Sequence, residues 1–296
     1  MLPVFKLLID QIANALVVGL TYALVALGFN LIFGIMRLLH FAHFEVYMVG
    51  AFGGLMAATY LKANIFIVFL SAMVSAGCLG VIIEKVGFYP IRKEPVETQL
   101  FSSIAIAIIL QNAALIIWGT QWTPFPELLT DKTYSIFWFN ISRVQLAVFG
   151  IVISILAGMR YALYNTKLGI SVRAVSFNRD AATLMGINTN TTISICFGLA
   201  SALAGAAGVV MGMYYHMVWP LMGATTGLKA IIAVIIGGIG SLPGSVVGGL
   251  ILGLSEGLAA GFISSTWREG IAFGIFFLVL LIKPSGLFAV QKDDKY

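Results

Sequence analysis

Long apolar runs separated by short polar stretches dominate the chain. The runs lie near residues 11–36, 41–61, 64–83, 98–119, 144–163, 190–214, 221–240, 244–263 and 270–282. Most are close to the length of about 20 residues that a helix needs to cross a bilayer. Lipid offers no partner to backbone N–H and C=O groups, so each run must be helical. The pattern predicts an all-α polytopic membrane protein with about 8–10 transmembrane helices, which we take as one transmembrane domain over 1–296.

Composition agrees with this assignment. The chain is 60% hydrophobic and only 10% charged, whereas soluble domains carry about 25% charged residues. This excludes an ordinary soluble enzyme, and we predict no nucleic-acid partner, because the basic pI near 9.2 suits loops that face anionic lipid. Cys78 and Cys196 both sit inside apolar runs and do not form a disulfide framework.

The distribution of lysine and arginine predicts the orientation. Segments 84–97, 164–189 and the tail after 282 together hold nine of these residues, against three in 120–143 and 264–269. Because basic residues are retained on the cytoplasmic side, we assign the first three segments to the cytoplasm. The orientation of the N-terminus stays open at this point, since 11–61 could hold two spans or one span and a broken helix.

Two interruptions of the helical pattern are candidates for a translocation pathway. The first, near 37–45, contains Arg37, His40, His43 and Glu45, and the second, near 237–244, contains Gly237, Gly238, Gly240, Pro243 and Gly244. Glycine and proline interrupt a helix and free backbone groups. At membrane depth such groups are tolerated only against protein or a water-filled cavity, and broken helices are typical of transport pathways.

Several polar residues in the spans have both a functional and a structural interpretation. Glu45 could line the pathway or pair with Arg37 or a histidine, whereas Glu256, among small residues, favours a structural role. His40 and His43 would share a helical face, but they lack the further ligands of a metal site, and we predict no metal. Gln111 and Asn112 could form hydrogen bonds between helices.

Small residues recur at every fourth position in two runs. One row is Ala200, Ala204, Gly208 and Gly212, and the other is Gly249, Gly253, Gly257 and Gly261. Such rows let membrane helices approach closely. The favoured interpretation is tight packing inside one subunit, and the alternative is an interface between subunits.

The segment 164–189 has more structure than a connector needs. Residues 180–185 favour a short helix, with Asp180 near its positive end and Gly186 as its C-terminal cap. An apolar face runs through Ala181, Leu184 and Met185, with Arg173 and Arg179 nearby. This helix could lie on lipid or dock into a groove on a partner.

This segment also resembles a known motif. Asp180-Ala-Ala-x-x-x-Gly186 is similar to the EAA-type loop of ABC importer permeases, with aspartate in place of glutamate. Four further segments, Leu39–Glu45, Leu110–Asn112, Gly237–Gly249 and Lys283–Phe288, resemble motifs of the branched-chain amino acid ABC permease family, and specifically its LivH-type subunits. The departures are His40 and Phe44, where that family usually has asparagine and glycine, so a different substrate is an open alternative.

The resemblance implies the permease subunit of an ATP-driven importer for leucine, isoleucine and valine in the bacterial inner membrane. A second permease would complete the pathway, and two ATPase subunits would bind ATP and Mg²⁺ and contact Arg173, Arg179, Asp180, Ala181, Ala182, Leu184 and Gly186. A soluble binding protein outside the cytoplasm would deliver the amino acid. The residues near the two interruptions would form the gate.

The sequence also bears on catalysis and on rival functions. It contains no phosphate-binding loop and no nucleophile elbow or two-histidine zinc helix, so we predict that the chain is not an enzyme and carries no cofactor. Relatives that carry urea or amides supply one alternative. An ion-coupled secondary transporter is another, although Glu45 and Glu256 are its only buried carboxylate candidates. A channel would need a filter or rings of charge.

Overall fold

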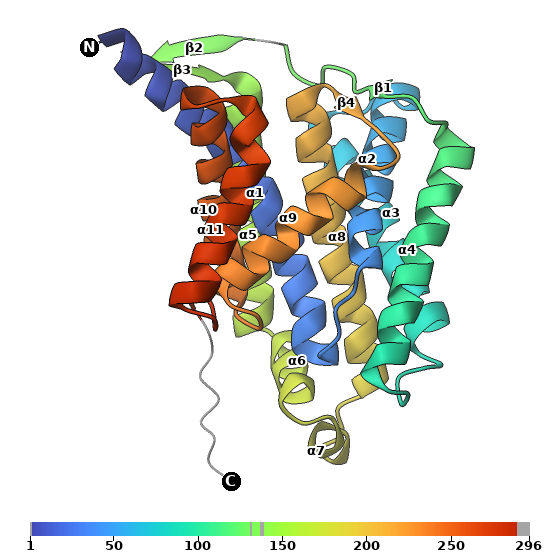
Figure 1. Cartoon of the computed structure of the whole chain (residues 1–296). Helices are drawn as coiled ribbons and strands as arrows, with labels where there is room; N and C mark the ends of the chain where they lie inside the picture. The colour runs from blue at the N-terminus through green and yellow to red at the C-terminus, as the bar shows by residue number, and fades with distance from the viewer. Residues whose placement is uncertain (1, 131, 137–138, 289–296) are drawn as a thin grey trace.

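A bundle of nine helices makes up most of the structure, a computed structural model that describes residues 2–130, 132–136 and 139–288. Within these residues the bundle helices (Figure 1) are α1 (Leu2–Met36), α2 (Ala42–Tyr60), α3 (Ile65–Ile83), α4 (Val96–Trp118), α5 (Arg143–Asn165), α8 (Thr189–Tyr215), α9 (Met222–Gly237), α10 (Leu242–Phe262) and α11 (Arg268–Ile282). They coincide with the nine predicted apolar runs. The prediction of an all-α polytopic membrane protein is confirmed.

Seven of the described helices are long and apolar enough to cross a membrane. The two remaining bundle helices are α2, which begins at the first interruption, and α9, which has 16 residues and ends at the second. The interruptions therefore mark the two places where the bundle departs from simple spans.

Short elements lie at the two ends of the bundle. The π-helical turn η1 (Glu84–Phe88), α6 (Lys167–Phe177) and α7 (Arg179–Leu184) lie at the lower end in Figure 1. At the other end, β1 (Thr123–Pro124) pairs with β4 (Met217–Val218), β2 (Thr133–Ile136) pairs with β3 (Phe139–Ser142), and η2 (Ser265–Trp267) precedes α11. The sequence did not predict these strands, which are too short to alter the fold class.

The segments predicted to be cytoplasmic gather at one end of the bundle. Residues 89–95, 164–189 and 283–288 lie together at the end that carries α6 and α7, and we call this the basic end (Figure 1). The N-terminus of α1 and the β2–β3 hairpin lie at the opposite end. The open question of 11–61 is therefore answered: this stretch consists of most of α1, an interruption and α2, and α1 begins at the end opposite the basic end.

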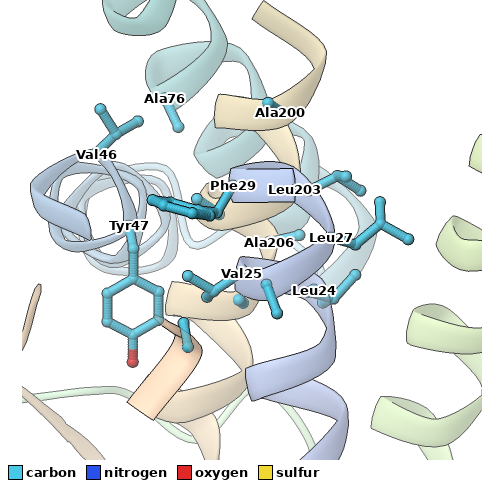
Figure 2. Packing of buried hydrophobic residues seen from close by; sticks show 14 of the residues in the cluster. Leu24, Val25, Leu27, Phe29, Val46, Tyr47, Ala76, Ala200, Leu203 and Ala206 are labelled. Carbon is cyan, nitrogen blue, oxygen red and sulfur yellow. The ribbon is translucent and has the colours of Figure 1, made fainter. Parts of the chain in front are cut away.

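The core forms around α1. This helix packs against α8, α9 and α10, and α8 also packs against α2 and α3. Figure 2 shows apolar side chains from α1, α2, α3 and α8 in this region, where Phe29 of α1 points toward α2. Phe29 and Tyr47 are each only about 1% exposed. Helices that meet this closely need small residues at their crossings.

Both rows of small residues lie at such crossings. Gly253 lies directly against Gly19 of α1, and Gly249 lies against Ala23 of the same helix. In the other row, Gly208 meets the backbone of α2 at Tyr47 and Ala51. The interpretation as packing inside one subunit is confirmed.

Candidate translocation and coupling site

The first interruption is shorter than the sequence predicts. It covers residues 37–41, because α2 already begins at Ala42 and includes His43 and Glu45 in its first turn. Arg37 has φ 55°, a left-handed conformation that side chains other than glycine rarely adopt. The turn of the chain out of α1 is therefore made at Arg37, which is exposed at the basic end.

The second interruption covers residues 238–241. Gly238 and Gly240 have φ 105° and 88°, which a side chain would oppose. Ser241 is the N-cap of α10, and its side chain accepts a hydrogen bond from the N–H of Gly244. Gly237, Pro243 and Gly244 are thus helical, and the predicted interruption at 237–244 shrinks by half.

Asn30 of α1 holds the second interruption in place. Its Nδ2 donates to the Ser241 carbonyl at 2.9 Å and to Ser245 Oγ at 2.7 Å, and its Oδ1 accepts from the Gly240 N–H at 2.7 Å. The side chain is buried. Asn30 was not among the predicted site residues, although it is one of only two asparagines in the apolar run 11–36, which was the available signal.

The two interruptions meet in one cleft of about 590 Å³ at the basic end. Its lining includes Arg37 from the first, Gly240 and Pro243 from the second, and Arg173 from α6. Residues that are far apart in the sequence therefore line the same cleft.

The remaining gate candidates of the second interruption have packing contacts instead. Gly237 and Gly244 lie against each other's backbone, and Gly286 of the C-terminal segment lies against Gly238. The N–H groups of Leu287 and Phe288 donate to the carbonyls of Ile236 and Gly237, both at 2.9 Å. The C-terminal segment is thereby attached to the end of α9.

His40 and His43 lie away from this cleft, inside the bundle. His40 Nδ1 lies 3.3 Å from Ser103 Oγ of α4, and its ring meets Phe88 edge-on at 4.9 Å between centroids. The ring of His43 lies 6.1 Å from that of His40 and packs beside Gly28. The two do not share one helical face, because His40 precedes α2. The described residues contain no group of three His, Cys, Asp or Glu side chains that could hold a metal.

Glu45 has a different partner from those expected. Its side chain is buried and Oε1 accepts a hydrogen bond of 2.8 Å from Gln111 Nε2 of α4. A partnership with Arg37 or a histidine is therefore wrong for this structure. The expected hydrogen bond between helices is confirmed for Gln111, whereas Asn112 bonds to the Ile108 carbonyl of its own helix. Glu45 also lies beside Gly223 of α9.

Glu256 belongs to a second polar cluster that joins three helices. Lys229 Nζ of α9 lies 3.1 Å from its carboxylate, and the Tyr22 hydroxyl of α1 donates to it at 2.9 Å. An uncompensated charge here would be costly in the membrane, so the pair supports the structural interpretation. Lys229 was missed, although it is an isolated lysine within an apolar run.

The short helix of the segment 164–189 forms as predicted, displaced by one residue. It is α7, Arg179–Leu184, and the Asn178 side chain caps it by accepting from the Ala181 N–H at 3.0 Å. Gly186 ends it with φ 84°, the left-handed conformation expected of a C-terminal cap.

An apolar surface projects from this part of the chain. We call it the apolar tip: Phe177, Leu184 and Met185, which are 94%, 88% and 83% exposed. Phe177 was not predicted. Ala181 and Asp180 are also exposed, but Ala182 is buried. Ala182 therefore packs inward and is not part of a surface that a partner could reach, which corrects its assignment to the coupling contact.

Two arginines connect the segment to the bundle. Arg179 Nη2 donates to the Ile35 carbonyl at 3.2 Å and lies 2.8 Å from Met36 Sδ, at the last turn of α1. Arg173 donates to the Leu163 carbonyl at the end of α5. Arg179 thus links α7 to the two residues that precede the first interruption.

A buried ion pair fixes the neighbouring part of the basic end. Arg92 pairs with Glu84 and donates to Asn190 Oδ1 of α8 at 2.7 Å, while Ser194 Oγ donates to Glu84 at 2.5 Å. Burial, with a contribution from the charge of Arg179, lowers the pKa of Arg92 to about 10. The guanidinium stays charged at neutral pH, so the pair joins η1 and the loop after it to α8 under ordinary conditions.

A membrane bundle with two interruptions that meet at a cleft, beside an exposed apolar tip, is typical of multi-pass membrane transport subunits. The chain belongs to the family described as branched-chain amino acid transport system / permease component, whose model matches residues 11–281. This is a family of permeases rather than enzymes.

Named relatives match over nearly the full length. The chain is 32% identical to the high-affinity branched-chain amino acid transport system permease protein BraD of Pseudomonas aeruginosa, over 97% of each. It is 31% identical to LivH of Escherichia coli K12, over 98% of each. Among solved structures, PsaBC from Streptococcus pneumoniae in complex with Fab aligns with TM-score 0.50 and 16% identity, over 92% of this chain and 91% of that one, a likeness of fold.

Proposed function

We propose that the chain is the permease subunit of an ATP-driven ABC importer for branched-chain amino acids, in the bacterial inner membrane with its basic end in the cytoplasm. The names of the relatives support this substrate. Residues 1–296 would act as one permease domain, and a second permease would complete the pathway. A soluble binding protein outside the cytoplasm would supply leucine, isoleucine or valine.

The observation that carries the proposal is the apolar tip beside Arg179. Three large side chains, Phe177, Leu184 and Met185, stand almost fully exposed at the basic end. Side chains of this kind anchor protein interfaces when they enter a groove on a partner. We therefore propose that 164–189 is the coupling loop, and that two ATPase subunits, which bind ATP and Mg²⁺, receive the apolar tip of each permease.

Movement of the docked helix would reach the pathway through Arg179 and α1. Arg179 contacts the last turn of α1, directly before Arg37 and the cleft shared by the two interruptions. ATP binding could shift the permease between two states only by differential contacts with them. The cleft with Arg37, Gly240 and Pro243 would be the cytoplasmic gate, and His40, His43 and Glu45 would line the bundle interior above it.

A charge in the apolar tip tests the docking. Leu184→Asp is expected to lower ATP-driven uptake at least about tenfold, because a carboxylate would have to lose its hydration in the apolar interface, while Leu184→Met retains most activity. Uptake is measured in vesicles that hold the complete transporter, and ATPase retention is measured by co-purification. Full retention and full uptake by Leu184→Asp would contradict the proposed docking.

Removal of the link to α1 tests the transmission step. Arg179→Ala is expected to keep the ATPase subunits bound, because the apolar tip is intact, but to lower uptake per ATP hydrolysed severalfold, because the contact with Ile35 and Met36 is lost. The measurement is the ratio of uptake to ATP hydrolysis in the same vesicles. An unchanged ratio would remove Arg179 from the mechanism.

The energy source and substrate separate the proposal from its rivals. Uptake that persists without ATP and follows a proton gradient would favour a secondary transporter. Binding measurements with the partner binding protein would decide between branched-chain amino acids and the alternative of urea or amides.

A further inference from the structure

An apolar groove lies on the outside of the bundle between α5 and α10. It encloses about 410 Å³, and its lining includes Leu27, Ile153, Leu156, Met159, Val246 and Val247. Both flanking helices are long and apolar enough to cross a membrane, and Ile153 is 58% exposed. The groove therefore lies at a depth where lipid chains are the surrounding medium.

The groove adjoins the cleft at the basic end that is described above. Tyr164, Leu242 and Pro243 line both spaces. Arg160 lines the groove, whereas Arg37 and Arg173 line the cleft. No aspartate or glutamate is among the described residues that line either space, so this positive charge has no carboxylate beside it.

Tyr164 positions two of the three guanidinium groups. The Cζ atom of Arg160 lies 5.3 Å from the centroid of the Tyr164 ring, and that of Arg173 lies 5.7 Å from it. Both distances fall within the range of cation–π interaction. The boundary between the groove and the cleft thus carries two arginines that are already oriented before any ligand arrives.

The length of the groove fits one leaflet. An α-helix rises 1.5 Å per residue, so Ile153 lies about 16 Å from Tyr164 along α5, close to half of the hydrocarbon thickness of about 30 Å. We propose that the groove and cleft bind one anionic phospholipid, with its phosphate at Arg160, Arg173 and Arg37 and an acyl chain along Ile153 and Val246.

A single lipid molecule supplies both chemistries that the site presents. Guanidinium groups bind phosphate through directed hydrogen bonds, and basic pockets between membrane helices are suited to anionic headgroups. A protein partner would have to place a carboxylate in the cleft and an extended apolar segment in the groove. The headgroup would touch both interrupted segments, at Arg37 and at Gly240, and would thereby favour one arrangement of the gate.

Retention of lipid by the full-length protein tests the proposal. The purified protein is incubated with phosphatidylglycerol or phosphatidylcholine, and bound lipid is counted by native mass spectrometry. We expect selective retention of phosphatidylglycerol and a loss of affinity of about fivefold for Arg160→Gln, the equivalent of about 1 kcal/mol for one basic residue. Ile153→Trp, which fills the groove at an exposed position, should weaken retention similarly.

Lys85→Gln is the matched control, because it removes one positive charge at the basic end on the other side of the bundle, beside Tyr89 and Asn190. It should leave retention unchanged. Equal loss in Lys85→Gln and Arg160→Gln would overturn the proposal, as would full retention by Ile153→Trp. Displacement by free glycerol 3-phosphate at equal concentration would indicate a phosphate site without a chain, and cross-linking of Ile153 to a second permease would assign the groove to that partner.

Discussion

Gly253→Leu is expected to prevent the bundle from assembling. Gly253 lies directly against Gly19 of α1, and a Cβ at this position would overlap the backbone of that helix. Flexible side chains can move aside, but a backbone cannot, so α1 and α10 would have to separate. Overpacking of a core already costs about 1–3 kcal/mol where side chains can adjust, and here the loss is expected to be larger. The yield of monodisperse protein in detergent should fall about tenfold.

Gly274→Leu is the matched control for this prediction. Gly274 lies on α11, where an added Cβ would meet nothing within 4 Å, and the position is exposed. The same change in side chain at a surface toward lipid should leave the yield and the thermal midpoint unchanged. Equal yields for the two variants would mean that the α1–α10 crossing does not require a small residue.

The second large effect is expected for Asn30→Leu. The substitution keeps the approximate size but leaves the Gly240 N–H without its acceptor on α1, while the Ser241 carbonyl still accepts from the N–H and Oγ of Ser245. A buried polar group that loses its hydrogen bond costs about 1–3 kcal/mol, so the free energy of unfolding should fall by about 2 kcal/mol. This corresponds to a fall of roughly 6 °C in the thermal midpoint, with uptake lost in parallel.

Asn112→Leu provides the comparison. Asn112 is exposed and bonds to the Ile108 carbonyl of its own helix, which is already part of the helical backbone. Its replacement should shift the midpoint by less than about 2 °C. If Asn30→Leu were as stable as Asn112→Leu, the interruption at 238–241 would not depend on α1.

The helices and the interruptions could be predicted from the sequence for definite physical reasons. A helix in lipid must satisfy its own backbone, so an apolar run of sufficient length has one structure available. The glycines of 237–240 and the short amphipathic pattern at 180–185 are local signals, and both led to the correct elements. The interruptions were predicted too long, because the first turn of a helix tolerates Pro243 and Glu45 as readily as a loop does.

The partners of the polar residues could not be predicted in the same way. Gln111 bonds Glu45 across 66 positions, and Asn30 bonds Ser241 across 211. Such pairs depend on how the helices cross, which the apolar pattern does not encode. The inward position of Ala182 and the exposure of Phe177 likewise depend on how α6 and α7 turn against the bundle.

The attachment of the last described residues to α9 has a consequence for movement at the second interruption. A helix that stops leaves its final carbonyls without partners, yet those of Ile236 and Gly237 receive the N–H groups of Leu287 and Phe288. The segment 283–288 thus supplies hydrogen-bond donors to the last carbonyls of α9, directly before the second interruption. A rotation of α10 at the second interruption therefore need not break these hydrogen bonds. A bulky fusion placed directly after Phe288 would strain the same contact.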